Sequence, residues 1–304
     1  MADVIRDGSI AGQIPAIPQL LPAAAGVFAA RAERFDTLAA GHSLEGYLRF
    51  AAALSRAQEG VLAAAVDLPV PGEELLAHCR AHDLPPLGVD GHRRDPVWRE
   101  MLGALIRSIE PGVMTDQAAS AAGRLQRMSA DALESAATNV LSGAYGELDP
   151  AIAPFLAAGL QVYWTGMALR LDGRVTARPA QIGLCPVCGS HPTASVVRIG
   201  GAVQGLRYLT CSLCCSEWHM VRIKCSACGS TKGISYFGIE GGSDAVKAEC
   251  CGECKTYLKI FHLEKDTSLV PAADDLATLA LDVLVDQEGY NRLGPNLLFV
   301  PGTP

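Results

Sequence analysis

The chain has 304 residues, of which 49% are hydrophobic and 19% charged, so it can bury a sizeable core in one large or two moderate domains. Its net charge of −7 is uneven, because residues 1–180, 181–265 and 266–304 hold 15, 9 and 1 basic residues against 20, 6 and 6 acidic ones. A nucleic-acid-binding surface needs a basic surplus, which excludes both end segments from that role.

The N-terminal residues 8–30 carry no charge and superficially resemble an export or membrane segment. Three prolines and two glutamines interrupt the run, and Asp3 and Asp7 stand where an export signal would have basic residues. We therefore predict an extended arm that leads into a helix. The protein is expected to be cytoplasmic, without membrane insertion.

The following residues, to about position 178, favour helices joined by short Pro/Gly turns, because alanine is abundant and strand-type alternation is scarce. Ser43, Thr115 and Ser129 are candidate N-caps. Two apolar stripes at helical spacing are more typical of a core than of a cofactor site: Trp98, Leu102, Leu105 and Ile109, and Leu156, Leu160, Tyr163, Trp164 and Met167. Cys79 falls in a helical pattern and is interpreted as a core residue.

Eight of the 11 cysteines form four Cys-x-x-Cys pairs. The pairs are Cys185/Cys188, Cys211/Cys214, Cys225/Cys228 and Cys251/Cys254. Adding 40 to each position of the first two pairs gives the last two, so the unit is an internal repeat. Gly189 and Gly229 follow the first pair of each repeat, where glycine can adopt the positive φ that turns backbone N–H groups toward the sulfurs.

Two such pairs about 22 residues apart can close a tetrahedral four-sulfur cage around one ion. We therefore predict two metal ions per chain, held by the eight paired cysteines. Zinc and a single rubredoxin-type iron both suit such a site. Disulfides would suit a small secreted domain, and a redox dithiol needs one pair rather than four, so both of these interpretations are weaker.

The register of the repeat separates the remaining cysteines from the ligands. Cys215 aligns with Lys255 and Cys250 with Thr210, so neither occupies a ligand position in both repeats. We interpret them as packing residues or as thiols that could compete for metal. Two histidines just beyond the cages could each replace a thiolate, although four sulfurs are already available: His219 and His262.

Short apolar runs punctuated by glycine predict strands between and after the cages. The runs are Ser195–Ile199, Leu206–Leu209, Trp218–Ile223 and Tyr257–Phe261. The C-terminal stretch predicts a helix that opens with Asp274 and Asp275, ahead of an apolar stripe.

The predicted fold class is thus α plus small β. It comprises an all-α helical domain over residues 1–178, two tandem rubredoxin-like or zinc-ribbon modules over 179–223 and 224–265, and a C-terminal helix and tail over 266–304. The predicted linker between the helical domain and the modules is Arg170–Pro179.

The sequence offers no catalytic equipment. It contains no glycine-rich phosphate loop, nucleophile elbow or His-Glu-x-x-His helix. A four-thiolate cage is closed, whereas catalytic zinc keeps an open position. Four thiolates and a divalent ion sum to −2, so two cages turn the +3 of residues 181–265 into about −1, which predicts no nucleic-acid partner. Structural, metal-sensing and electron-transfer roles remain.

Short sequence segments outside the cysteine pairs resemble the FdhE family, the formate dehydrogenase accessory proteins. They include Gly205-Leu-Arg-Tyr-Leu, Ser216-Glu-Trp-His, Val221-Arg-Ile-Lys, Thr256-Tyr-Leu-Lys, Asp274-Asp-Leu, Gln287-Glu-Gly-Tyr and Phe299-Val-Pro-Gly, with Arg31-Ala-Glu-Arg and Tyr47-Leu-Arg-Phe in the helical part. Generic zinc ribbons share only the cysteine pairs, so these additional segments make the resemblance specific.

The resemblance implies a cytoplasmic maturation factor that binds the catalytic subunit of respiratory formate dehydrogenase before its twin-arginine-dependent export. It also implies rubredoxin-like sites on the eight paired cysteines, with iron favoured and zinc an alternative. In a purely structural variant, the cages support a docking surface that includes Trp218, His219, Arg222 and Tyr257. A rubredoxin-type electron donor to a client metalloenzyme is the second hypothesis, and a nucleic-acid-binding zinc ribbon is the third.

Overall fold

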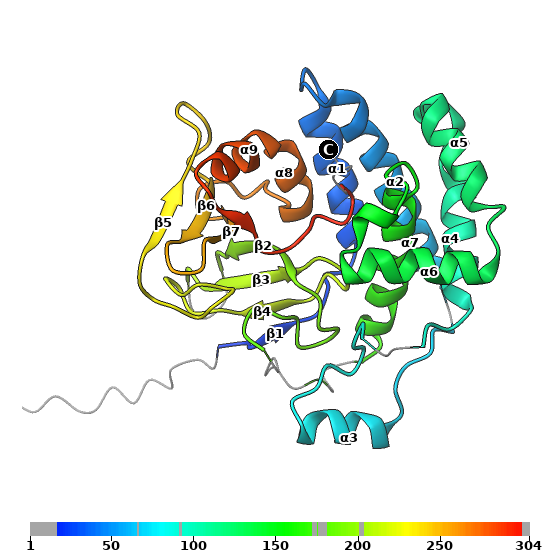
Figure 1. Ribbon diagram of the computed structural model, residues 1–304, viewed down its shortest axis with the longest axis horizontal. Helices are drawn as coiled ribbons and strands as arrows, with labels where there is room; N and C mark the ends of the chain where they lie inside the picture. Colours follow the sequence, from blue (N-terminus) through cyan, green and yellow to red (C-terminus); the bar gives the residue numbers. More distant parts are fainter. Residues whose placement is uncertain are drawn as a thin grey trace, which may run out of the picture.

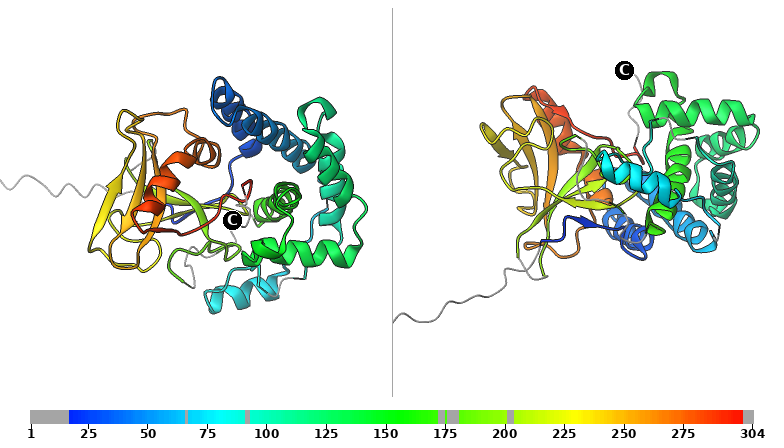
Figure 2. Two further views of the ribbon diagram at one scale, coloured as in Figure 1. Left: turned by 45° about the horizontal axis from the view of Figure 1, so that its top comes forward. Right: turned by 90° about the horizontal axis from the view of Figure 1, so that it is seen from below.

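The computed structural model describes residues 17–65, 67–90, 93–171, 175, 181–200 and 204–299. The helices that precede the cysteine repeats lie on one side of the molecule and a mixed β-sheet lies on the other, with two C-terminal helices against the sheet (Figures 1 and 2). The C-terminal segment then returns to the contact between the two sides. Most of the predicted linker at Arg170–Pro179, and the residues from 300 onward, lie outside the described residues.

Seven α-helices and two short 3₁₀ helices, η1 and η2, precede the cysteine repeats within the described ranges. Their bounds are α1 Val27–Ala39, α2 Glu45–Ala64, α3 Glu73–Ala81, α4 Val97–Ser108, η1 Pro111–Val113, α5 Asp116–Leu125, α6 Ala130–Ser142, η2 Tyr145–Glu147 and α7 Ala153–Leu169.

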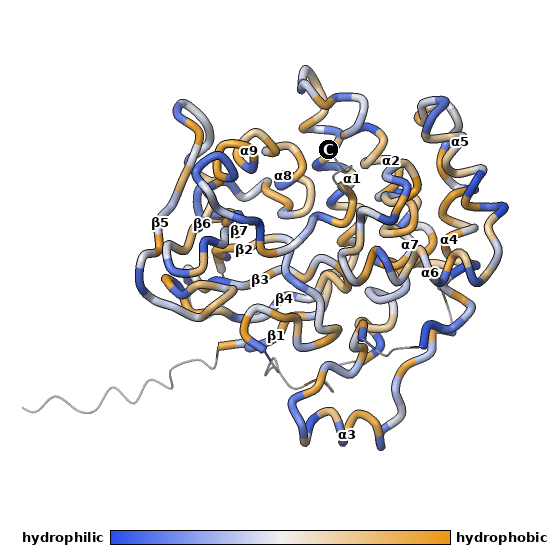
Figure 3. Tube along the Cα trace, viewed as in Figure 1, coloured by the Kyte–Doolittle hydropathy of each residue, from blue (hydrophilic) through white to orange (hydrophobic). Residues whose placement is uncertain are grey.

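Helix α7 is the centre of the helical part. The predicted stripe of Leu156, Leu160, Tyr163, Trp164 and Met167 is fully buried, which confirms its assignment to the core. Every residue of α7 except the last is buried, so the helix has no solvent face. Helices α2, α4 and α6 pack against it, and α4 with the residue that follows it contributes the second predicted stripe. Figure 3 shows hydrophobic residues both in the helices and in the strands on either side of the contact between the helical part and the sheet.

Two of the three predicted helix N-caps are confirmed. Thr115 and Ser129 cap α5 and α6, since their hydroxyl oxygens accept hydrogen bonds from backbone N–H groups three residues later, at 3.2 and 3.3 Å. The prediction for Ser43 was wrong. Helix α2 begins at Glu45, and the ring nitrogen Nδ1 of His42 accepts the Leu44 N–H instead, at 3.0 Å.

The sheet has the strand order β1-β4-β3-β2-β7-β6-β5, with β8 also paired to β7. The strand bounds are β1 Leu20–Leu21, β2 Pro192–Val197, β3 Arg207–Cys211, β4 Glu217–His219, β5 Ile234–Phe237, β6 Val246–Cys251, β7 Thr256–His262 and β8 Asn291–Arg292. Neighbouring strands are antiparallel except for the parallel pairs β2–β7 and β7–β8.

The 40-residue repeat is visible in this topology. Strands β2, β3 and β4 of the first repeat correspond to β5, β6 and β7 of the second, and each set forms an antiparallel unit of its own. The first strand of one unit pairs in parallel with the last strand of the other. The two predicted modules therefore share one continuous sheet. The predicted fold class is confirmed.

The C-terminal segment forms two short helices, α8 Pro271–Ala277 and α9 Leu279–Gln287. Helix α8 begins at Pro271, three residues before the predicted start, but Asp274 lies in its first turn as predicted, and Asp274 and Asp275 are both buried. Asp274 forms an ion pair with Arg34 of α1 at 2.6 Å, and Asp275 lies 3.3 Å from the ammonium of buried Lys259. These aspartates therefore attach the C-terminal segment to α1 and to the sheet. Within the described ranges, no helix combines the length and apolar character needed to span a membrane.

Candidate metal centres

The eight predicted cysteines come together as two groups of four, one in each repeat, with the sulfurs of a group all within 4.8 Å of one another. We call Cys185, Cys188, Cys211 and Cys214 the first cage, and Cys225, Cys228, Cys251 and Cys254 the second cage. All 11 cysteines of the chain are free.

The sulfur spacing fits a common tetrahedral ion. Sulfurs from opposite pairs approach to 3.6 and 3.4 Å in the first cage and to 3.6 and 3.8 Å in the second. A tetrahedron with metal–sulfur bonds of about 2.3 Å has sulfur–sulfur edges of about 3.8 Å. A disulfide bond is far shorter, at about 2.05 Å. The donor set of four sulfurs suits zinc or iron.

Each Cys-x-x-Cys pair ends in the same backbone corner. Gly189 and Gly229 have φ of 76° and 74°, as predicted. At the second pair of each repeat the equivalent residues are Cys215 and Lys255, with φ of 57° and 56°. The register that aligned these two residues in the sequence thus reflects a shared positive-φ position, which is unusual for residues other than glycine.

Backbone N–H groups in these turns point at the sulfurs. The N–H groups of Leu213 and Cys214 lie 3.4 Å from the sulfur of Cys211, and those of Ala227 and Cys228 lie 3.3 and 3.5 Å from the sulfur of Cys225. Hydrogen bonds to a thiolate favour the charged form that binds metal. The backbone therefore prepares both groups for a cation.

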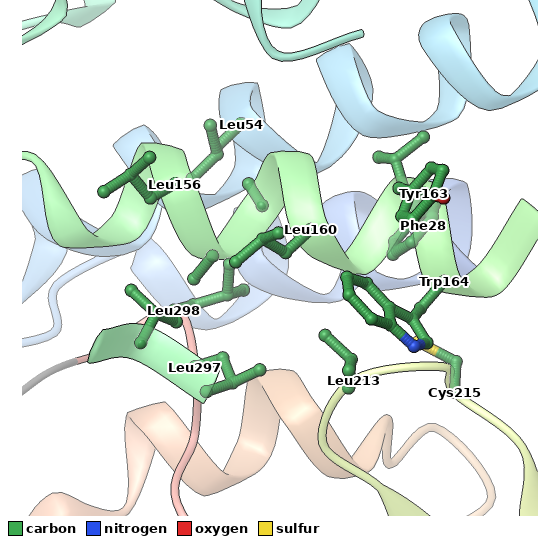
Figure 4. Close-up of a cluster of buried hydrophobic side chains, with 14 of the residues drawn as sticks. Phe28, Leu54, Leu156, Leu160, Tyr163, Trp164, Leu213, Cys215, Leu297 and Leu298 are labelled. Carbon is green, nitrogen blue, oxygen red and sulfur yellow. The ribbon is translucent and has the colours of Figure 1, made fainter. Parts of the chain in front are cut away.

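The first cage is buried beneath the helical part of the chain. The backbone N–H groups of Leu87 and Val89 donate to carbonyl oxygens of the first turn, those of Val187 and Cys188, at 2.9 and 3.0 Å. The indole of Trp164 on α7 donates to the carbonyl of Leu87 at 2.9 Å. Figure 4 shows Trp164 beside Leu213 and Cys215 of the cage loop. Helix α7 therefore supports the cage directly and through residues 87–89.

Burial raises the pKa of the Cys185 and Cys211 thiols, because apolar surroundings disfavour the thiolate. A bound cation would supply the compensating charge.

A buried arginine from the helical part lies beside the loop that carries two ligands of the first cage. Arg31 of α1 donates to the side-chain oxygen of Gln161 at 3.0 Å and to the sulfur of Cys215 at 3.4 Å. The Gln161 side chain in turn donates to the carbonyl of Ser212 at 2.7 Å. With a divalent ion bound, the four thiolates would leave a charge of about −2, which the nearby guanidinium would partly offset.

The second cage has the same ligands and turns but lies at the surface. Cys228 is exposed and Cys254 partly exposed, whereas all four cysteines of the first cage are buried. A partner molecule can therefore approach the sulfurs of the second cage, while the first cage is covered by protein.

Comparison with known proteins shows the family to which this chain belongs. The family models for the FdhE N-terminal, central and C-terminal domains match residues 16–181, 184–222 and 223–299. The chain belongs to the FdhE family. It is 43% identical to a Protein FdhE homolog of Edwardsiella ictaluri over 95% of this chain and 93% of that protein. It is 40% identical to Protein FdhE of Salmonella typhimurium over 94% and 92%.

The crystal structure of the FdhE protein from Pseudomonas aeruginosa superposes with a TM-score of 0.86 at 39% identity, covering 94% of this chain and all of that one. The FdhE likeness therefore extends over helices, sheet and both cages.

Arg207 lies in one of the sequence segments that resemble the FdhE family, and its structural role was not predicted from the sequence. Its guanidinium is fully buried and forms an ion pair with Glu249 of the second repeat at 2.7 Å. It also donates to the hydroxyls of Ser195 and Ser226, both at 2.7 Å. Arg207 thus joins the first repeat to the turn of the second cage. The only sequence signal for this buried role is a charged arginine within an otherwise apolar predicted strand.

The other predicted candidates lie outside both groups. Cys79 is buried in α3, and Cys215 and Cys250 are buried beside the cages. The His219 ring stacks edge-on against Tyr208, and His262 lies 3.6 Å from Glu264.

The predicted docking surface was wrong in two of its four residues. Trp218 and Tyr257 are buried, because Trp218 is paired between β1 and β3 and the Tyr257 hydroxyl donates to Asp282 at 2.8 Å.

Proposed function

We propose that this chain is an accessory factor that binds the catalytic subunit of formate dehydrogenase in the cytoplasm, before export of that subunit, and is needed for its activity. The observation that carries the proposal is the match of three FdhE domain models over nearly the whole chain. The identity of about 40% to Protein FdhE of Salmonella supports it, because both proteins are covered over more than nine-tenths of their length.

The eight paired cysteines are proposed to hold two metal ions, one in each cage. Such ions would stabilise the turns and could carry one electron if they are iron. Closed four-thiolate cages leave no open coordination position for hydrolysis. The proposed role is therefore recognition and maturation of a client, with no catalytic residue in this chain.

Electron transfer from a rubredoxin-type iron is a second candidate. The specific observation in its favour is the exposure of Cys228 and the partial exposure of Cys254. An exposed sulfur shortens the path from a bound ion to a docked partner. Full support of client activity by a protein loaded only with zinc would exclude this candidate.

The test of the main proposal is co-purification. The tagged chain is expressed with the formate dehydrogenase catalytic subunit, and the complex is isolated from the cytoplasmic fraction and weighed by native mass spectrometry. We expect a complex of the two chains, and an inactive dehydrogenase in cells that lack the accessory chain. A Cys79→Ser variant, which alters a cysteine outside both cages, serves as the matched control and should bind equally well. Absence of the catalytic subunit from the purified protein would contradict the proposal.

A further inference from the structure

The loop that leads into the second cage is strained at an exposed apolar residue. Ile223 has φ of 57°, a left-handed conformation that is a genuine outlier for a β-branched side chain. The sequence predicted a strand from Trp218 to Ile223, but β4 ends at His219. Ile223 is nevertheless 59% exposed, so the burial of its own side chain does not compensate the strain.

Buried Arg207 imposes this loop conformation. Its guanidinium donates to the carbonyl of Lys224 at 2.9 Å and to that of Val221 at 3.4 Å. The ion pair with Glu249 fixes the guanidinium in turn. With both carbonyls turned inward, Val221 and Ile223 are presented to solvent at 58% and 59% exposure. Strain held in place by surrounding contacts is typical of functional sites.

The exposed loop is continuous with the second cage. Gly229, the corner of that cage's first turn, is flanked by two side chains: a Cβ placed there would lie 2.9 Å from Cδ1 of Ile182 and 3.5 Å from Cε of Lys224. Ile182 is itself 38% exposed. These residues and the exposed residue Cys228 form one surface, which we call the cage patch: Ile182, Val221, Arg222, Ile223, Lys224 and Cys228.

The charge of the cage patch defines its partner. Beside the second cage, Lys224, Lys232 and Lys255 contribute +3, against −1 from Glu253 and about −2 from four thiolates with a divalent ion. These charges cancel and leave Arg222 in excess. Its hydrogen bond is to the carbonyl of Gly205 at 3.4 Å, and no carboxylate among the described residues forms an ion pair with it. A carboxylate on a partner would complement it.

We propose that the cage patch docks a short apolar segment of a partner polypeptide that carries a carboxylate opposite Arg222. This inference rests on the proposed function, in which the partner is the formate dehydrogenase catalytic subunit. The side chains of Val221 and Ile223 form the apolar contact, and the segment passes over the exposed ligand Cys228. Docking then covers the thiolates of the second cage.

The central test replaces Ile223 with asparagine, which tolerates positive φ and removes the apolar surface. The Ile223→Asn variant should therefore fold at least as stably as the parent, with a raised melting temperature, yet bind the purified catalytic subunit about tenfold more weakly, as for an interface hot spot. Arg222→Glu should weaken binding by a similar factor and make it less sensitive to salt. The matched control is Val283→Asn, since Val283 on α9 is exposed to nearly the same extent, at 57%.

The dissociation constants are measured by titration calorimetry on metal-loaded full-length protein. Binding by the parent and by Val283→Asn, with weak binding by the two patch variants, supports the inference. Equal binding by the parent and Ile223→Asn overturns it while leaving the proposed function intact. No binding by the parent overturns both. A chain that dimerises through the patch, so that Ile223→Asn abolishes dimerisation without changing client binding, assigns the surface to a second copy and also overturns the inference.

Discussion

The two cages of this FdhE-family chain have the same four ligands, the same positive-φ corners and the same spacing, yet their surroundings differ. The first cage lies beneath α7, and residues 87–89 are hydrogen-bonded to its first turn. The second cage lies at the surface with Cys228 exposed. Local sequence therefore determines the donor set, while distant segments determine which cage a partner can reach. We infer that the first cage serves mainly the fold and the second serves the client.

The strongest test of this difference compares equivalent ligands, Cys188→Ser and Cys228→Ser. Structural zinc contributes about 10 to 16 kcal/mol in small model domains, so each variant should lose the metal of its own cage. Because Cys188 lies in the main core, its loss should also destabilise the helical part and reduce expression of folded protein. Cys228→Ser should retain the helical signal and one metal ion. Metal analysis and circular dichroism measure both effects, and equal damage from the two variants would remove the distinction.

The next largest effect is expected for Arg207→Met, which leaves Glu249 buried without its cation. Breaking a buried ion pair costs about 3 to 5 kcal/mol. The second cage should loosen first, because Arg207 holds its entry loop. Urea titrations of parent and variant, with metal content followed in parallel, measure this cost.

The Arg207→Met defect should also depend on pH. Burial already raises the pKa of Glu249 above its ordinary value, and loss of Arg207 removes an opposing influence. A carboxyl whose folded pKa is raised binds its proton more tightly in the folded state, so its contribution to stability is present at low pH and lost as pH rises through that pKa. The defect should therefore be smaller at pH 6 than at pH 8. Arg207→Met with Glu249→Gln is the control, and its stability difference from the parent should lose this pH dependence.

A smaller effect is expected for Trp164→Phe, which removes the indole donor to Leu87 and leaves a small cavity. A buried acceptor without its partner costs about 1 to 3 kcal/mol. The variant should lose metal faster from the first cage and leave the second unchanged. The same rate at both cages would show that α7 does not protect the first cage.

The smallest effect is expected for Cys215→Ser. Cys215 lies outside both groups of four, and the serine oxygen could accept the Arg31 hydrogen bond that the sulfur accepts. Two metal ions per chain should be retained, with a stability loss of about 1 kcal/mol. Loss of a metal ion would refute the register that separates Cys215 from the ligands.

The sequence could predict those features that depend on neighbouring residues, and it could not predict those that depend on residues far away in the chain. The 40-residue offset of the cysteines predicted the two groups of four, and the N-caps Thr115 and Ser129 were right, because these features depend on a few neighbouring residues. The strand predicted to reach Ile223 stops early because Arg207, more than ten residues away, binds its carbonyls.

The burial of Trp218 and Tyr257 could not be predicted for the same reason. It depends on Leu20, at the start of the described chain, and on Asp282, near its end. The unequal exposure of the cages likewise depends on the contact of Leu87 with Val187, which lie 100 residues apart.

The most direct test of the central claim is a chelation time course on protein loaded with two metal ions. The protein is treated with excess chelator and iodoacetamide, the ions are counted by native mass spectrometry, and the alkylated cysteines are mapped. We predict a long-lived species with one ion, in which the only alkylated cysteines among the eight paired ones are Cys225, Cys228, Cys251 and Cys254. Simultaneous loss of both ions, or first alkylation of Cys185, Cys188, Cys211 or Cys214, would contradict the division of roles between the cages.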